Sequence, residues 1–315
     1  MQNVGYGRAV AVMLMLCLAA FRADGKKLYR YQDGNGQWAY ADRPPAAVTA
    51  GEEVAVRQLD VKPRQLVRLF QSGDPQQPDY SIINEYAGPA EVLFTFSAQD
   101  NVRANPALPA RFVLASGLSE KLVKISILNS RLPWRFSVNY QFVPGKPLPD
   151  YRSSYPYLPP FAPGRSFTVT QGFNGGFTHS ETHNRYAVDI AMPVGTPVHA
   201  AREGVVISVE NDFYKNGLEE KYRPASNCIL ILHDDGSMAV YAHLELEKAL
   251  VTPGTAVKAG QLIAYSGNTG FSSGPHLHFS VQYNRGMELV SVPFGFRGAD
   301  GQTFAPSAGQ AVTAF

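Results

Sequence analysis

The chain has 315 residues, of which 45% are hydrophobic, 17% charged and 11% aromatic, which excludes a disordered, collagen-like or coiled-coil protein. Its two cysteines exclude a disulfide-rich scaffold and a four-cysteine zinc module. Residues 1–23 carry two arginines and no acid, so without them the 28 basic residues fall to 26, equal to the 26 acidic ones, and no basic field favours nucleic acid.

Residues 1–23 have the features of a signal peptide. Arg8 precedes an apolar run over 9–20, and alanines follow where a signal peptidase could cut. The run is too short to span a bilayer comfortably, although an uncleaved anchor is the alternative. We expect export to the periplasm, the cell envelope or the medium, with a mature chain that is not embedded in the membrane. Cys17 would leave with the signal, so Cys228 would remain as an unpaired structural thiol.

The segment 24–46 predicts a small aromatic hairpin. Tyr29 and Tyr31 alternate before the Asp-Gly-Asn-Gly turn sequence, and Trp38 and Tyr40 alternate after it. This segment resembles a small hairpin module found near the N-terminus of many exported bacterial proteins.

Residues 50–143 contain short apolar runs separated by proline and glycine. Phe136, Val138 and Tyr140 show the period of two that is typical of a strand with one buried face. The segment has no long helical period, no histidine and no acidic cluster, so we expect an antiparallel β-sandwich that binds or spaces rather than catalyses. The strand-like runs are 54–59, 81–86, 91–97, 111–114, 122–128 and 135–143.

Three further segments complete an all-β chain. Seven prolines predict a semi-rigid linker over 144–164, whose aromatic residues would pack on a neighbouring surface. Residues 165–293 hold all seven histidines and further strand-like runs, which predict a second domain with a small antiparallel sheet. Residues 294–315 form the C-terminal tail, in which small and polar residues predominate from about Pro306. We expect this tail to be frayed.

The clearest chemical signal is His276-Leu277-His278 inside a strand-like run. Side chains at positions i and i+2 of a strand point to the same face, so both imidazoles reach one site. Two such histidines can supply zinc ligands, or one ligand and one catalytic base. The pattern alone also fits two half-exposed histidines of a sheet.

A second signal is Asp189, which lies in an apolar strand-like run where a carboxylate is costly unless it is paired or bound to metal. His179 and His183 lie upstream in a polar segment, and His243 ends an apolar strand downstream.

The other candidates receive structural interpretations. His199 is expected to be a surface or packing residue, and His233 is expected to lie at the edge of a hairpin. Glu181, which lacks a His-Glu-x-x-His frame, is expected to be a solvated loop acid.

Together these motifs resemble the lysostaphin-like (LytM-type) zinc metallopeptidases over residues 165–293. After the Asp strand, the chain has in order Gly-Thr-Pro-Val, Ala-Arg-Glu-Gly-Val-Val, Tyr-Ala-His-Leu, Gly-Asn-Thr-Gly and Gly-Pro-His-Leu-His-Phe. The resemblance implies a small antiparallel sheet that holds one Zn²⁺ per chain, with a water in the open position. Its ligands would be His179, Asp189 and His278. His243 and His276 would then act on the water and on the transition state.

The first ligand departs from the family's common His-x-x-x-Asp spacing. Here His183 and His179 stand six and ten positions before Asp189. A subgroup with a longer insertion uses a histidine that follows Ser or Thr, and Thr178-His179 fits that pattern. We favour His179 and keep His183 as the alternative, because the loop decides which imidazole comes within about 2.1 Å of the metal.

The resemblance implies an exported zinc endopeptidase whose substrate is the peptide cross-link of peptidoglycan. Nothing indicates a nucleic-acid partner, and the sequence does not define an oligomeric state. Two alternatives remain open. In the first alternative, the chain is a non-catalytic cell-wall-binding or amidase-activating protein of the same fold. In the second, it is a latent enzyme whose N-terminal domain or linker covers the groove.

Overall fold

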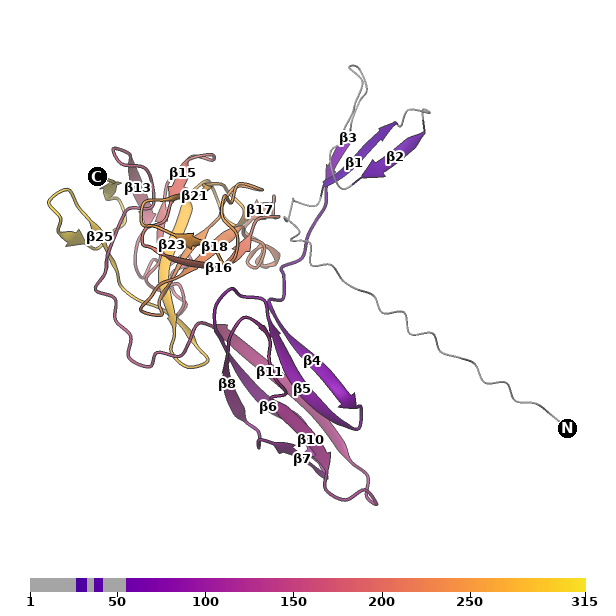
Figure 1. Cartoon of the computed structure of the whole chain (residues 1–315). Coiled ribbons are helices and arrows are strands. Elements are labelled where there is room, and N and C mark those ends of the chain that lie inside the picture. The colour runs from indigo at the N-terminus through magenta and orange to yellow at the C-terminus, as the bar shows by residue number, and fades with distance from the viewer. Residues whose placement is uncertain (1–26, 33–36, 42–54) are drawn as a thin grey trace.

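The computed structural model describes residues 27–32, 37–41 and 55–315 (Figure 1). The predicted signal peptide, Cys17 and the turn of the N-terminal hairpin lie outside the described residues. Apart from the short 3₁₀ turn η1 (Glu220–Tyr222), every regular element in the described ranges is a strand, which confirms the all-β prediction. Within the same ranges, no helix is long and apolar enough to cross a bilayer.

A small N-terminal sheet has the strand order β2-β1-β3. The antiparallel pairing of β1 (Lys27–Gln32) with β2 (Trp38–Ala41) agrees with the predicted hairpin. β3 (Ala55–Gln58), which the sequence pattern places in the sandwich, pairs instead with the other edge of β1. The free edge of β1 provides hydrogen-bond partners for β3. The first strand of the sandwich is therefore β4.

Two antiparallel sheets form the sandwich (Figure 1). One has the order β4-β5-β10-β7 with β9 on β5, and the other has the order β11-β6-β8. Alternate residues of both sheets, such as Ile82, Phe94 and Ile125, are fully buried between them, because each strand has one apolar face. The strands are β4 (Val67–Asp74), β5 (Gln77–Asn84), β6 (Ala90–Asp100), β7 (Val102–Asn105), β8 (Ala110–Leu114), β9 (Gly117–Leu118), β10 (Val123–Ile127) and β11 (Arg135–Pro144).

A larger sheet organises the C-terminal domain, in the order β20-β16-β18-β19-β23-β14-β13-β27 with β24 on β23. In its central strand β23, Leu277, Phe279 and Val281 pack into the core, while His278 belongs to the opposite face. The strands are β13 (Ser166–Gln171), β14 (Val188–Ile190), β16 (Gly204–Glu210), β18 (Cys228–Leu232), β19 (Met238–Ala242), β20 (Ala256–Val257), β23 (Leu277–Asn284), β24 (Leu289–Ser291) and β27 (Ala311–Thr313).

Smaller pairings surround this sheet. A two-stranded sheet joins β15 to β21, another joins β17 to β22, and a three-stranded one has the order β12-β25-β26. These strands are β12 (Pro156–Tyr157), β15 (Pro197–His199), β17 (Asn216–Gly217), β21 (Leu262–Tyr265), β22 (Gly270–Phe271), β25 (Gly295–Arg297) and β26 (Thr303–Phe304).

The proline-rich segment is packed onto the C-terminal domain. Tyr157 is fully buried, and its ring centre lies 5.9 Å from that of Phe294 and 6.3 Å from that of Phe279. The Leu158 N–H donates a hydrogen bond of 2.8 Å to the Ala201 carbonyl. The segment therefore contributes to the core of the domain, and its aromatic residues pack as the sequence analysis expects.

The C-terminal segment is not a frayed tail. Its strand β27 pairs with β13, and Val312 and Ala314 are buried in the same core as Phe294 and Phe296. Apolar residues at positions 312 and 314 have the period of a half-buried strand, and the edge of β13 gives that strand a partner. The C-terminal domain thus extends well beyond residue 293.

The sandwich contacts the C-terminal domain through the turn between β5 and β6. There the Ala87 N–H donates a 2.9 Å hydrogen bond to the carbonyl of Ile207 in β16. A Cβ at Gly88 would lie 2.7 Å from Ile207, so only glycine allows this approach. Nearby, the buried Glu91 carboxylate accepts a 2.9 Å hydrogen bond from the Asn284 side chain. These contacts join the sandwich to β16 and β23 of the large sheet.

Candidate metal centre and substrate groove

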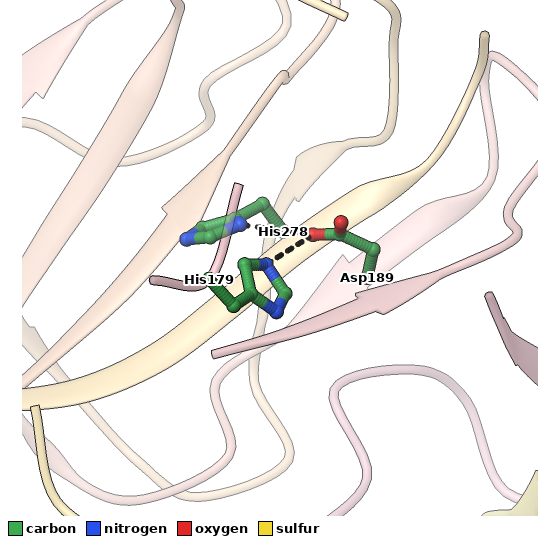
Figure 2. Close-up of side chains that lie close together, drawn as sticks. All are labelled: His179, Asp189 and His278. Atoms are coloured by element: carbon green, nitrogen blue, oxygen red, sulfur yellow. Dashed lines mark hydrogen bonds and ion pairs between the residues drawn. The ribbon is translucent and has the colours of Figure 1, made fainter. Parts of the chain in front are cut away.

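Two strands and one loop bring His179, Asp189 and His278 together (Figure 2). Asp189 in β14 stands directly opposite His278 in β23, and the His278 Nδ1 lies 2.9 Å from the Asp189 Oδ1. The loop after β13 delivers His179, whose Nε2 lies 3.3 Å from the same oxygen. One ligand atom from each residue falls within 4.8 Å of the others.

The orientation of His179 suits a metal ligand. Its Nδ1 lies 2.9 Å from the Gly172 carbonyl, which only accepts hydrogen bonds, so this nitrogen carries the proton. The Nε2 is left as a lone-pair donor that is buried without a hydrogen-bond partner, an arrangement that costs about 1–3 kcal/mol unless a ligand satisfies it. Two imidazole nitrogens and a carboxylate oxygen are a common zinc donor set, and ligands with bonds of about 2.1 Å lie roughly 3.4 Å apart around a tetrahedral ion.

Asp189 is held as a carboxylate. Burial by itself raises the pKa of Asp189, but the imidazoles of His179 and His278 beside its carboxylate outweigh burial and keep this pKa well below its usual range. The Gln171 Nε2 donates a 3.1 Å hydrogen bond to the other carboxylate oxygen, Oδ2. Gln171 was not singled out from the sequence, because its role follows from a position opposite Asp189 in the β13–β14 pair.

His243 and His276 form a second pair beside the cluster, with ring centres 4.4 Å apart. The His276 Nε2 lies 3.7 Å from the Asp189 Oδ1, and the ring of His243 lies 5.9 Å from that of His278. His243 has a φ of 63°, a left-handed conformation that a non-glycine residue seldom adopts and that is frequent at functional sites.

Backbone carbonyls orient both of these imidazoles. The Nδ1 of His243 lies 2.6 Å from the Thr269 carbonyl, and that of His276 lies 2.8 Å from the Gly274 carbonyl. Each Nδ1 must therefore donate, which leaves each Nε2 as a proton acceptor. Burial lowers the pKa of His276, and burial together with the neighbouring histidines lowers that of His243 to about 3, so both rings are neutral at neutral pH.

The other sequence candidates lie outside the cluster. The His183 side chain is 41% exposed, and its Nδ1 lies 3.6 Å from the carboxylate of Glu181, which is 56% exposed. His233 is buried, with its Nδ1 2.6 Å from the Glu203 carbonyl, and its ring lies 6.0 Å from that of Tyr157. Cys228 has a free thiol, and burial raises the pKa of this thiol to about 12, which leaves it protonated and unreactive.

A groove of about 820 Å³ extends from the histidine cluster over the outer face of the large sheet. His243 and His276 line it beside the candidate metal centre, and Cys228 and Val240 contribute to its floor. Residues from the N-terminal half of the chain, among them Tyr86, also line the groove. The sequence did not identify these lining residues, since they come from separate domains.

Comparisons with known families match two parts of the chain. Residues 183–289 match the family described as Peptidase family M23, and residues 14–65 match a domain of unknown function, DUF4124. The M23 match includes Asp189, His243, His276 and His278 and begins after His179.

Several known proteins are similar to part of this chain. Peptidoglycan DD-endopeptidase ShyA of Vibrio cholerae is 41% identical over 99 residues, which are 31% of this chain and 20% of the relative. Glycyl-glycine endopeptidase ALE-1 of Staphylococcus capitis is 35% identical over 137 residues, which are 44% of this chain and 31% of the relative. The solved catalytic domain of lysostaphin from Staphylococcus simulans aligns with 38% of this chain and 80% of its own, at 32% identity and a TM-score of 0.28. The chain thus matches no more than 31% of the length of these two curated relatives.

Proposed function

Because residues 183–289 match Peptidase family M23, we propose that this protein is an exported zinc endopeptidase that hydrolyses peptide cross-links of peptidoglycan. One observation carries the proposal. His179, Asp189 and His278 converge to within 4.8 Å beside the neutral pair His243 and His276. Two relatives carry the names peptidoglycan DD-endopeptidase and glycyl-glycine endopeptidase, which supports a cell-wall peptide as the substrate class.

His179, Asp189 and His278 would hold one zinc ion per chain. When bound, zinc lowers the pKa of a coordinated water from near 16 toward about 7 and polarises a carbonyl group. The ionised Asp189 supplies negative charge to this site, and Gln171 fixes its orientation from the outer side.

His243 and His276 would move protons in the reaction. Each presents a neutral Nε2, which can accept the proton of the attacking water and later return it to the amine that leaves. Because each Nδ1–H is anchored on a backbone carbonyl, neither ring has to reorient during catalysis. A protonated imidazole can also stabilise the oxyanion that forms on the substrate.

The alternatives are less favoured by this arrangement. A non-catalytic wall-binding or amidase-activating protein has no need for the three candidate ligands and the two carbonyl-anchored bases that this chain retains. A latent enzyme requires a covered groove, whereas here a hollow of about 820 Å³ adjoins the cluster with the two halves of the chain in place.

Metal analysis and hydrolysis of purified cell-wall sacculi test the proposal on the mature protein. We expect one zinc per chain, loss of hydrolysis after chelation, and recovery when zinc is restored. The variant Glu288→Gln is the matched control, since its exposed carboxylate pairs with Arg285 and lies outside both the cluster and the groove. Hydrolysis that survives complete removal of metal, or a zinc-loaded protein that cleaves no cross-link, would reject the proposed function.

A further inference from the structure

One row of side chains crosses the large sheet from the candidate metal centre. Successive strand pairs place His278 opposite Ala242, Ala242 opposite Cys228, and Cys228 opposite Glu210. All of these pairs are antiparallel, and directly opposite residues of such pairs point to the same face of a sheet. Glu210 therefore belongs to the same face as His278, three strands away.

The spacing of this row suits an extended peptide. Neighbouring strands lie about 4.8 Å apart, so Glu210 is about 14 Å from His278 along the row. An extended chain covers that distance with about four residues. The small side chains of Ala242 and Cys228 lie between the two positions and line the groove, so they leave space above the sheet. A substrate whose reacting bond is at the cluster can thus reach Glu210.

Arg64 and Tyr86 of the N-terminal half line the same groove as Glu210, and both lie close enough to interact with it electrostatically. Arg64 precedes β4, and its guanidinium is half exposed and 3.6 Å from the Glu85 carboxylate. Tyr86 follows β5 and is held in place because the next residue, Ala87, is bonded to β16. Burial raises the pKa of the Tyr86 phenol to about 12, so its hydroxyl remains a hydrogen-bond donor.

Glu210 is a partly buried carboxylate in this surface. Burial raises the pKa of Glu210 to about 6, with a further rise caused by Asp212 and an opposing effect of Arg64. Above that pH the Glu210 carboxylate carries a negative charge in a partly buried position, where pairing with a positive charge is favourable. A ligand with a cationic group can supply this neutralisation, and the nearby guanidinium can pair with an anionic group of the same ligand.

We propose that Glu210 and Arg64 form an end subsite for a cross-link residue that carries an ammonium and a carboxylate group on one carbon, as a diamino dicarboxylic acid does. Glu210 pairs with the ammonium group and Arg64 with the carboxylate group, while Tyr86 lines one side of the subsite. The chemical identity of the substrate rests on the proposed peptidoglycan function. In this arrangement the N-terminal half takes part in substrate recognition.

Binding of uncleavable probes to the full-length mature protein tests the subsite by calorimetry. The three probes are single stem peptides without a cross-link that differ in their last side chain. The first side chain carries an ammonium and a carboxylate group, the second carries only the ammonium group (lysine), and the third carries only the carboxylate group. Loss of one charged pair weakens binding of the doubly charged probe by about ten- to a hundredfold. We therefore expect this loss for Glu210→Gln and for Arg64→Gln.

The singly charged probes distinguish the two roles. Glu210→Gln is expected to weaken the lysine probe and leave the carboxylate probe unchanged, and Arg64→Gln is expected to do the reverse. Arg68→Gln is the matched control, because Arg68 pairs with the same Glu85 and is not among the groove-lining residues. Equal affinity of the wild-type protein for all three probes, or equal effects of both variants on every probe, would overturn the subsite. Because no turnover is measured, selective binding would uphold the subsite even if the protein failed to hydrolyse cell walls.

Discussion

His278 stands directly opposite Asp189 across the β14–β23 pair, with its Nδ1 2.9 Å from the Asp189 Oδ1. Backbone hydrogen bonds of two neighbouring strands hold both residues, so the separation of these two ligand atoms does not depend on a mobile loop. His179 is the one candidate ligand supplied by a loop, and its Nδ1 is anchored to the Gly172 carbonyl.

Removal of any one candidate ligand is expected to abolish zinc binding. His179→Ala, Asp189→Ala and His278→Ala should each lower the zinc content of the purified protein from one per chain toward zero, because two remaining ligands bind zinc poorly. His183→Ala is the comparison, since its ring is 41% exposed and lies outside the cluster. The opposite order in a zinc titration, with His183→Ala losing the metal and His179→Ala keeping it, would transfer the ligand role to His183.

Removal of either proton-transfer candidate is expected to separate metal binding from turnover. His243→Ala and His276→Ala should retain zinc but lose about 10²–10⁴ in the rate of cross-link hydrolysis, the usual contribution of general acid–base catalysis. Metal analysis and a kinetic assay on the same preparations check this expectation. Near wild-type hydrolysis in both variants would contradict the proposed roles.

Tyr157 is expected to be essential for the stability of the C-terminal domain. Tyr157→Ala removes a fully buried aromatic ring and should lower the free energy of unfolding by about 3–5 kcal/mol. A fragment that starts at residue 165 should be destabilised for the same reason, whereas one that starts at residue 147 keeps the ring. Chemical denaturation of the variant and both fragments measures the effect, and equal stability of the two fragments would show that the segment is only a linker.

Acid is expected to destabilise the protein through His233. Burial lowers the pKa of His233 to about 4, against an ordinary value near 6.5, so its neutral form stabilises the fold above pH 6.5. This contribution falls as the pH decreases through 4, by about 3 kcal/mol between pH 7 and pH 4. Urea denaturation at both pH values should show a smaller loss for His233→Gln than for the wild-type protein. An equal loss in the two proteins would contradict the assignment.

Local sequence patterns were sufficient to single out the main residues of the candidate site. His276 and His278 are two positions apart, so a strand puts both on one face whatever surrounds it. Asp189 was recognisable because a carboxylate within an apolar run needs a partner. The alternation of apolar residues likewise predicted most of the strands and the all-β class, since burial of one face depends only on neighbouring positions.

Only the tertiary structure decided which distant segments meet. The pairing of β27 with β13 and the burial of Tyr157 turned an expected tail and linker into parts of one core. Strand register alone places Glu210 in line with His278, and contact between domains brings Arg64 to the same groove. Register and edge pairing depend on residues far apart in the chain, which the local period of a strand does not encode. The sequence thus singled out the residues of the candidate metal centre, while the tertiary structure determined the groove that leads to it.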